Sequence, residues 1–356
     1  MSLTMREVLE QLLAGKHLTA AQAADLLTAL AKSDADPALI GGVLVALRAK
    51  GETADEMLGF AQAQRALARK PALNQGLVNH AVDVVGTGGD GMNTFNLSTG
   101  SALLAAACGV PVVKHGNRSI SSRSGAADVL EALGLPMPLD EHQAAECLAR
   151  TGFTFLFAPH YHPAVGALVA ARKSLGIRTV FNILGPLTNP AAPPYGVIGA
   201  CTREIAKGMA EVFARMPIKR VLVINSDDGA DEPTPVCAFT VFDATPGSVD
   251  SYQITPEEVG LRRCERTALR GGDAANNAAA IKRVFAGEQS PHRDALLLGA
   301  GLALAAAGRV ESLRGGVNTA DKAIDDGRAA ALLFSLETLF PRETAAAPAK
   351  AVGASK

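Results

Sequence analysis

The sequence has no tryptophan, and aromatic residues make up only 4% of its 356 residues. This scarcity argues against a platform on which the bases of single-stranded nucleic acid could stack. No charge of one sign predominates, since 34 lysines and arginines stand against 35 aspartates and glutamates. The chain therefore lacks the bulk charge that would hold nucleic acid or an anionic membrane, and any phosphate binding must be local.

Long apolar runs and a cysteine framework are also missing. The longest uncharged apolar stretch, residues 295–308, is shorter than the roughly 20 residues of a membrane span, so it predicts a buried helix. The five cysteines are scattered and form no CxxC pair, which favours reduced thiols in a cytoplasmic protein over a zinc or disulfide site. The charged start of the chain is unlike a secretion signal.

What is present is a large apolar fraction, 48%, enough for a chain of this length to form two lobes. Residues 1–72 contain only helical patterns, with Leu, Ile, Val or Ala at three- and four-residue spacing. We expect them to form a small all-helical domain. Its predicted helices cover residues 5–13, 19–32, 36–50 and 53–67.

From residue 73 onward, short β-rich runs alternate with helical patterns, which predicts an α/β domain with a central, mostly parallel sheet flanked by helices. A hairpin is expected around Pro246-Gly247, and the tail 344–356 is expected to be disordered because it lacks an apolar period. The predicted strands are 81–85, 110–113, 153–157 and 221–224, with the hairpin strands at 238–243 and 251–254.

A glycine-rich loop at residues 86–91 directly follows the first of these strands. Its glycines remove Cβ atoms where the backbone must turn sharply, and the polar residues Asn96, Ser98 and Thr99 precede a predicted helix. Strand, glycine loop and helix N-terminus together form a place for phosphate. The loop matches neither the P-loop nor the dinucleotide pattern. The alternative is a tight turn between strand and helix without function.

A second polar loop, residues 114–122, follows the next strand, where open α/β sheets bind ligands. Lys114 could neutralise a phosphate, while His115 and Asn117 could face a polar planar substrate. Alternatively, residues 121–124 only cap the helix expected at 126–133.

Two further groups of charged residues are ambiguous by themselves. Arg172, on a predicted helix, carries a planar guanidinium suited to a carboxylate, but such an arginine is more often a surface ion-pair partner. Residues 227–232 place Asp231 and Glu232 after a strand, where they could bind a hard cation such as Mg²⁺ or form an acidic surface turn.

The combination of motifs, in this order and at these spacings, is specific. GTGGD (86–90), NxST (96–99), KHGN (114–117) and RxxLGxRTxFNxLGPLxNP (172–190) strongly resemble the anthranilate phosphoribosyltransferase family of tryptophan biosynthesis. The likeness extends from the N-terminal helices to about residue 338 and includes residues 271–274 and 277–278.

The resemblance implies a nucleoside phosphorylase/phosphoribosyltransferase-like fold. A segment around 163–185 would complete the helical domain, leaving 73–162 and 186–340 as the large domain. It also implies transfer of the phosphoribosyl group of 5-phosphoribosyl-1-pyrophosphate (PRPP) to anthranilate, with no dedicated general base. The residues that the family assigns to PRPP correspond here to Gly86, Thr87, Gly88, Gly89, Asp90, Thr94, Asn96, Ser98, Thr99, Lys114 and Ser122. Those assigned to anthranilate correspond to Gly86, His115, Asn117, Arg172, Gly185 and Pro186.

The same resemblance implies two Mg²⁺ per active site, one bound by Ser98 and the other by Asp231 and Glu232, and a cytoplasmic homodimer formed through the helical domain. The apolar positions of that domain, more than a small layer can bury alone, are consistent with a dimer. They are Leu12, Leu26, Leu27, Leu30, Ile40, Val43 and Leu44.

The sequence departs from the family pattern at four places. The usual Gly-Leu-Asp-Glu has Ala230 instead of Leu and is followed by Pro233; Asn225 replaces a common His, and Gly299 replaces the Asn of an Asn-Ala pair. Both carboxylates are retained, so metal binding is still expected, while Ala230 and Pro233 leave the shape of the acidic loop undetermined by the sequence.

Two other classes of function remain as alternatives. A pyrimidine-nucleoside phosphorylase would share the architecture but would not need the acidic pair. A nucleic-acid-binding relative would be expected to lose GTGGD and to gain basic surface.

Overall fold

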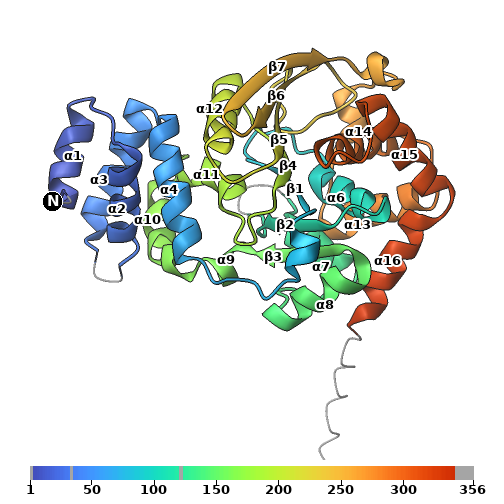
Figure 1. Ribbon diagram of the computed structural model, residues 1–356, viewed down its shortest axis with the longest axis horizontal. Coiled ribbons are helices and arrows are strands. Elements are labelled where there is room, and N and C mark those ends of the chain that lie inside the picture. The colour runs from blue at the N-terminus through green and yellow to red at the C-terminus, as the bar shows by residue number, and fades with distance from the viewer. Residues whose placement is uncertain (1–2, 33–34, 120–122, 341–356) are drawn as a thin grey trace, which may run out of the picture.

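The computed structural model describes residues 3–32, 35–119 and 123–340 (Figure 1). Its N-terminal layer is helical, and three of its helices begin at residues that the sequence favours as N-caps. The side chains of Thr19, Asp36 and Thr53 each accept a hydrogen bond from a backbone N–H in the first turn. The layer contains α1 (Met5–Leu13), α2 (Ala20–Leu30), α3 (Pro37–Lys50) and α4 (Ala54–Leu67).

A seven-stranded sheet forms the centre of the molecule, with the order β3-β2-β1-β4-β5-β6-β7. Neighbouring strands from β3 to β5 run parallel, and β6 and β7 are antiparallel additions, so the predicted mostly parallel sheet is confirmed. The strands are β1 (Val82–Gly86), β2 (Val112–Gly116), β3 (Phe153–Phe157), β4 (Tyr195–Gly199), β5 (Arg220–Ser226), β6 (Phe239–Thr245) and β7 (Ser248–Ile254).

The predicted hairpin is present as β6 and β7, joined through Pro246 and Gly247. Strand β4 was not predicted. Its five residues include two glycines, which weaken any β pattern, and its strand conformation comes from pairing with β1 and β5 on both sides.

Helices cover both faces of the sheet. One face carries α6 (Leu97–Ala107), which packs against α14 (Pro291–Ala306) and α16 (Arg328–Leu339), and the other carries α12 (Arg203–Ala214), which packs against α4. The remaining α-helices are α5 (Gln75–Val78), α7 (Ala126–Ala132), α8 (Glu141–Thr151), α9 (Ala158–Tyr161), α10 (Ala167–Leu175), α11 (Phe181–Leu184), α13 (Ala274–Phe285) and α15 (Leu313–Asp325). Short 3-10 turns are η1 (Pro163–Gly166), η2 (Gly185–Thr188), η3 (Pro256–Val259) and η4 (Arg266–Leu269).

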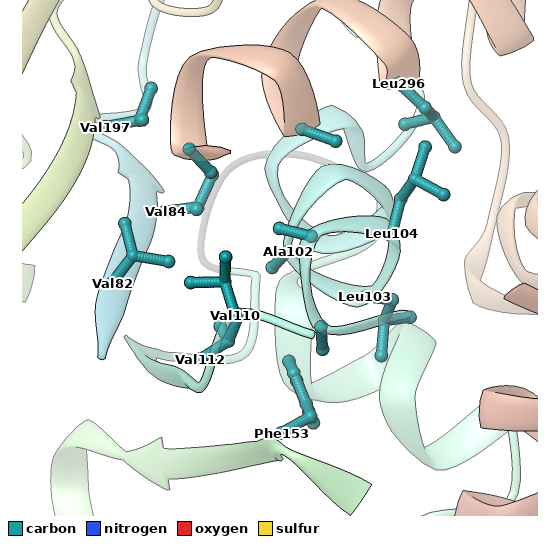
Figure 2. Close-up of a cluster of buried hydrophobic side chains, with 14 of the residues drawn as sticks. Val82, Val84, Ala102, Leu103, Leu104, Val110, Val112, Phe153, Val197 and Leu296 are labelled. Atoms are coloured by element: carbon teal, nitrogen blue, oxygen red, sulfur yellow. The ribbon is translucent and has the colours of Figure 1, made fainter. Parts of the chain in front are cut away.

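The larger hydrophobic core lies between the sheet and α6. Figure 2 shows valines of β1 and β2 facing Ala102 and Leu103 of this helix, with Phe153 of β3 beneath them. Residues Ala102 to Ala105 are completely buried, because α6 is enclosed by the sheet on one side and by α14 to α16 on the other. This packing fixes the N-terminus of α6 at the carboxyl edge of the sheet.

A second core joins the helical layer to the opposite face of the sheet, and it corrects one argument from the sequence. The seven apolar residues that we took to exceed what the layer can bury are at most 3% exposed within the single chain. They pack with Leu168, Val180, Leu184 and parts of α12 and β5, so these seven residues leave no excess apolar surface for a partner chain to cover. The argument failed because it did not count the segments that return to the layer.

The segment 163–187 is one of these returns, and α10 packs against α3. The exact division of the chain at residues 72, 163 and 186 stays a prediction. The tail 344–356 lies outside the described residues. In the ranges that are described, no helix is long and apolar enough to cross a membrane.

Candidate active site

The candidate site lies at the carboxyl ends of β1 and β4, which are neighbours in the sheet. After β1 the chain continues into α6 on one face, and after β4 it continues into α12 on the other. This divergence opens a crevice at the strand ends, the usual position of ligands in open α/β sheets. The loops after β1, β2 and β5 surround the crevice.

The glycine loop after β1 has a defined backbone conformation and hydrogen bonds to another loop, so it is more than a tight turn. Gly88, Gly89 and Gly91 have φ of +70°, +78° and +73°, a conformation that residues with a Cβ rarely adopt. The N–H of Gly88 donates to the Asp231 carboxylate, and the N–H of Asp231 donates to Asp90 Oδ2 at 3.3 Å. These two hydrogen bonds therefore join the glycine loop to the acidic loop, residues 227–232.

Asp231 lies in a buried position that two further glycines make possible, and Glu232 beside it is half-buried. A Cβ on Gly199 would lie 1.4 Å from the Asp231 carbonyl oxygen, and one on Gly86 would lie 2.4 Å from Asp231 Oδ2. The Glu232 carboxylate accepts a hydrogen bond of 3.0 Å from the N–H of Ser98, in the first turn of α6. This arrangement excludes the alternative of an acidic surface turn.

Burial and like charge act on the same pair. Burial, followed by the charges of Glu232 and Asp90, raises the pKa of Asp231 well above its ordinary range. Burial also raises the pKa of Glu232 to about 7, although Ser98 and Lys114 partly oppose this shift. A cation bound here would relieve both the burial cost and the repulsion.

Lys114 lies behind this pair, at the end of β2, and is only 1% exposed. Its ammonium donates to the carbonyl of Val84 and, at 3.3 Å, to Ser98 Oγ. Burial lowers the pKa of Lys114, while Asp83 and Glu232 partly restore it. The sequence prediction that Lys114 and Ser98 belong to one site agrees with this contact.

The donor set fits Mg²⁺ with a substrate that supplies further oxygens. The described ranges contain no group of three or more His, Cys, Asp or Glu side chains that could hold a metal ion by themselves. Mg²⁺ commonly takes only one or two protein carboxylates and completes its shell with water and phosphate oxygens. Asp231, Glu232 and the hydroxyl of Ser98 match that requirement.

On another side of the candidate site, η2 packs against β2. His115 Nδ1 lies 3.2 Å from the Gly185 carbonyl, which can only accept, so Nδ1 carries the proton. Burial, followed by the neighbouring His162, lowers the pKa of His115 to about 3, and the ring is neutral near pH 7. Its Nε2 is buried without a hydrogen-bond partner in the described structure.

Arg172 is half-buried on α10, with its guanidinium 5.3 Å from the ring centre of Phe181. No ion pair of Arg172 occurs among the residues that the structure describes, which weakens the surface ion-pair alternative. A guanidinium without a carboxylate partner in the protein can take a carboxylate from a ligand.

Other predicted site residues have different surroundings. Asn117 is exposed at the end of the β2 loop, and Thr94 forms an isolated bridge with Arg270 beside the glycine loop. The Thr99 side chain is completely buried in α6. Ser122 lies outside the described residues. Helix α7 begins after Gly125, without a side-chain cap, so Ser124 does not cap it.

Arg178 is a neighbour of the glycine loop that was not nominated from the sequence. Its guanidinium donates to the carbonyls of Gly89 at 2.9 Å and Gly88 at 3.1 Å. The only available signal was its place in the long motif, because no local pattern indicates which loop an arginine will reach.

The departures from the family pattern are accommodated. Asn225 donates to the Ala200 carbonyl at 2.9 Å, and Ala230 is buried under the acidic loop. A Cβ on Gly299 would lie 2.2 Å from Ser101 Oγ, so Gly299 and Ser101 fit each other behind the site.

Comparisons with known proteins agree along nearly the whole chain. Residues 6–68 match the model of a glycosyl transferase family helical bundle domain, and residues 78–330 match that of a glycosyl transferase family a/b domain. The chain is 48% identical to an anthranilate phosphoribosyltransferase of Brevibacillus brevis over 90% of this chain and 93% of that protein. It is 43% identical to the anthranilate phosphoribosyltransferase of Paramagnetospirillum magneticum over 95% of this chain and 96% of that protein.

Solved structures extend the similarity to the fold. The anthranilate phosphoribosyltransferase of Thermus thermophilus superposes with a TM-score of 0.86 at 40% identity, covering 93% of this chain and 98% of that one. The Saccharomyces cerevisiae enzyme in complex with PRPP and Mg superposes with a TM-score of 0.83 at 26% identity. The superposition covers 93% of this chain and 96% of that one.

The close approach at Gly199 yields a stability prediction. We expect Gly199→Ala to lower the free energy of unfolding by about 2–3 kcal/mol, because the new methyl group overlaps the backbone of Asp231. Gly196→Ala in the same strand is the control, since its Cβ would meet only side-chain methyl carbons of Val221 and Ile198, the nearest at 3.3 Å. Urea denaturation followed by circular dichroism compares them, and equal midpoints would contradict the packing argument.

Proposed function

The chain belongs to the anthranilate phosphoribosyltransferase family, and from this premise we propose which residues of the crevice bind each substrate. It transfers the phosphoribosyl group of PRPP to the amine of anthranilate and releases pyrophosphate. One observation carries the assignment of the site. It is the acidic pair, Asp231 and Glu232, held between the glycine loop and the first turn of α6 at the crevice.

The donor half, for PRPP, consists of the glycine loop, the first turn of α6 and Lys114. Loop N–H groups and a helix N-terminus favour anionic oxygens, and Lys114 adds a positive charge behind Ser98. The proposed residues are Gly86, Thr87, Gly88, Gly89, Asp90, Thr94, Asn96, Ser98, Thr99 and Lys114. For Thr99 the backbone is the group in question, because its side chain is buried.

The enzyme uses Mg²⁺, as in the yeast structure with PRPP and Mg, and two ions per site are our proposal. Ser98 would bind one, and Asp231 and Glu232 the other. When bound, Mg²⁺ neutralises charge that develops on the pyrophosphate oxygens. The repulsion within the acidic pair supports a cation at this place.

The acceptor half, for anthranilate, consists of His115, Asn117, Arg172, Gly185 and Pro186. The yeast enzyme in complex with 4-fluoroanthranilate is a related structure of the same fold, with a TM-score of 0.82. Arg172 would pair with the carboxylate, and the contact between His115 and Gly185 joins two walls of this half. Gly86, at the end of β1, borders both halves.

Catalysis then requires charge stabilisation and positioning. Pyrophosphate leaves C1 of the ribose as the ring gains oxocarbenium character, so negative charge grows on its oxygens. Loop N–H groups and Lys114 are placed to stabilise that charge. The aromatic amine attacks through its lone pair without prior loss of a proton, so orientation suffices and we assign no general base.

The metal assignment is tested by neutral isosteres. Asp231→Asn combined with Glu232→Gln should lower kcat/KM at least about a hundredfold, since Lewis-acid stabilisation is worth several kcal/mol. The metal-free variant should be no less stable than the parent, because neutral amides replace two carboxylates whose negative charge is disfavoured by burial and by each other. Asp227→Asn, an exposed carboxylate of the same loop, is the control. Near-normal turnover of the double variant in Mg²⁺ would refute the assignment.

Arg172→Ala should weaken the use of anthranilate by roughly ten- to a hundredfold, the equivalent of a charge-assisted bidentate pair. The change should fall mainly on KM for anthranilate and leave KM for PRPP nearly constant. Arg172→Lys should recover part of the loss, because it restores the charge but not the planar fork. Steady-state kinetics with each substrate varied provide the measurement, and Lys173→Ala is the exposed neighbouring control. A selective effect on PRPP would invalidate the division into halves.

We also propose a homodimer formed through the helical layer. Support comes from apolar side chains that remain exposed on contacting helices: Leu13 at 66%, Val45 at 42% and Val169 at 56%. Closed two-fold dimers are the commonest assembly. A cytoplasmic location is proposed as well, supported by five free cysteines.

Sedimentation at micromolar concentration should give twice the chain mass, and Val45→Glu with Val169→Glu should give the monomer. Phe334→Glu on α16, where the side chain is 68% exposed, should leave the mass unchanged. A monomeric parent protein would refute the dimer.

A further inference from the structure

Asn277 has no part in the site described above, although its side chain is buried at 3% exposure in the first turn of α13. Its Oδ1 accepts a hydrogen bond of 2.7 Å from the N–H of Gly272. Its Nδ2 donates to Asn96 Oδ1 at 2.8 Å. The amide of Asn96 in turn donates to the Ser124 carbonyl at 3.2 Å. Two side-chain amides thus form a chain between two backbone groups.

The direction of this chain of hydrogen bonds is determined at both ends. A backbone N–H can only donate, so the oxygen of the Asn277 amide must face Gly272. A backbone carbonyl can only accept, so the nitrogen of the Asn96 amide must face Ser124. With these orientations a donor of Asn277 meets an acceptor of Asn96 in the middle. Turning either amide over would place two donors or two acceptors together.

The backbone around the chain is equally well defined. The N–H of Phe95 donates to the Leu269 carbonyl at 3.0 Å, and the N–H of Gly271 donates to the Asn93 carbonyl at 2.8 Å. A Cβ on Gly271 would lie 2.6 Å from the Thr94 carbonyl oxygen, so the two segments are in close backbone contact. The start of α13 is therefore held at a constant distance from Asn96.

Asn96 occupies the N-cap position of α6, where an asparagine usually bonds to the helix backbone, but its side chain makes no capping bond. The amide is used in the contact with Asn277 instead. Asn96 is half-buried, and its nitrogen carries two hydrogens, of which Ser124 takes one. The second hydrogen is available to a ligand of the donor half.

We infer that Asn277 is a positioning residue for PRPP: it holds the Asn96 amide so that an N–H, and not the carbonyl oxygen, faces the donor half of the crevice. The phosphate and ribose oxygens of PRPP are acceptors for this N–H. The inference rests on the proposed function in that Asn96 belongs to the donor half. It gives a role to the Asn277-Ala278 segment, which no substrate assignment had explained.

Asn277→Asp tests the inference most directly, because its carboxylate can still accept from the Gly272 N–H but can no longer donate to Asn96 Oδ1 or, at 3.3 Å, to the Gly272 carbonyl. The Asn96 amide should turn over. We expect the Kd of PRPP in the presence of Mg²⁺, measured by calorimetry, to rise about tenfold or more. KM for anthranilate should change less than about twofold. Asn276→Asp, the same substitution at the exposed neighbour, should leave both unchanged.

A double-mutant cycle with Asn96→Ala separates positioning from a structural role. Once Asn96 is removed, Asn277→Asp should cost no further PRPP affinity; a full additional loss would mean general damage and overturn the inference. Wild-type PRPP affinity of Asn277→Asp would overturn it as well. If Asn96→Ala alone binds PRPP normally, the assignment of Asn96 to the donor half fails first.

If Asn277→Asp does not fold, Asn96→Asp is the substitute test of the inference. This variant keeps the acceptor for Asn277 Nδ2 but removes the N–H that faces the ligand. The inference requires a rise in the Kd of PRPP similar to that of Asn277→Asp, and an unchanged Kd contradicts it. Circular dichroism reports whether each variant is folded.

Discussion

The carboxylates of buried Asp231 and half-buried Glu232 lie beside each other with Asp90 nearby, and the rest of the site depends on holding them there. Their raised pKa values record the cost of this arrangement in the absence of a counter-ion. The surrounding groups reduce the cost only in part, through the N–H groups of Gly88 and Ser98. In the proposed assignment, a metal ion that arrives with an anionic substrate would supply the missing charge, so binding strength and catalytic stabilisation would come from the same source.

Contacts between the two halves explain why they form one site. Arg178, from the segment between α10 and α11, holds two carbonyls of the glycine loop, and a Cβ on Gly89 would lie 2.6 Å from its guanidinium. Asn189, after η2, donates to buried Asp83 and to the Val113 carbonyl. The segment after η2 is therefore hydrogen-bonded to β1 and β2 within the sheet, and Arg178 bonds the segment before α11 to the glycine loop.

The local features of the site were predictable because they depend on residue type at a given spacing. The glycine loop after β1 and the acidic pair after β5 follow from the sequence. In the helical layer, the predicted helix starts at residues 19, 36 and 53 coincide with the observed N-caps. Strand β4 was not predictable, since it exists only through its neighbours. The argument from surplus leucines was wrong for a related reason: residues far along the chain bury them.

The sequence by itself determined the family, most of the helices and strands, and the residue types proposed to meet phosphate, metal and carboxylate. Those properties can be predicted from short motifs, because each motif depends only on residues that are close together in the sequence. Only the tertiary structure decided that Gly199 must lack a side chain, that Arg178 reaches the glycine loop, and that Asn277 orients Asn96 across 181 positions of sequence. These contacts arise where distant segments pack together, and no spacing along a chain specifies which groups will then lie within hydrogen-bond distance.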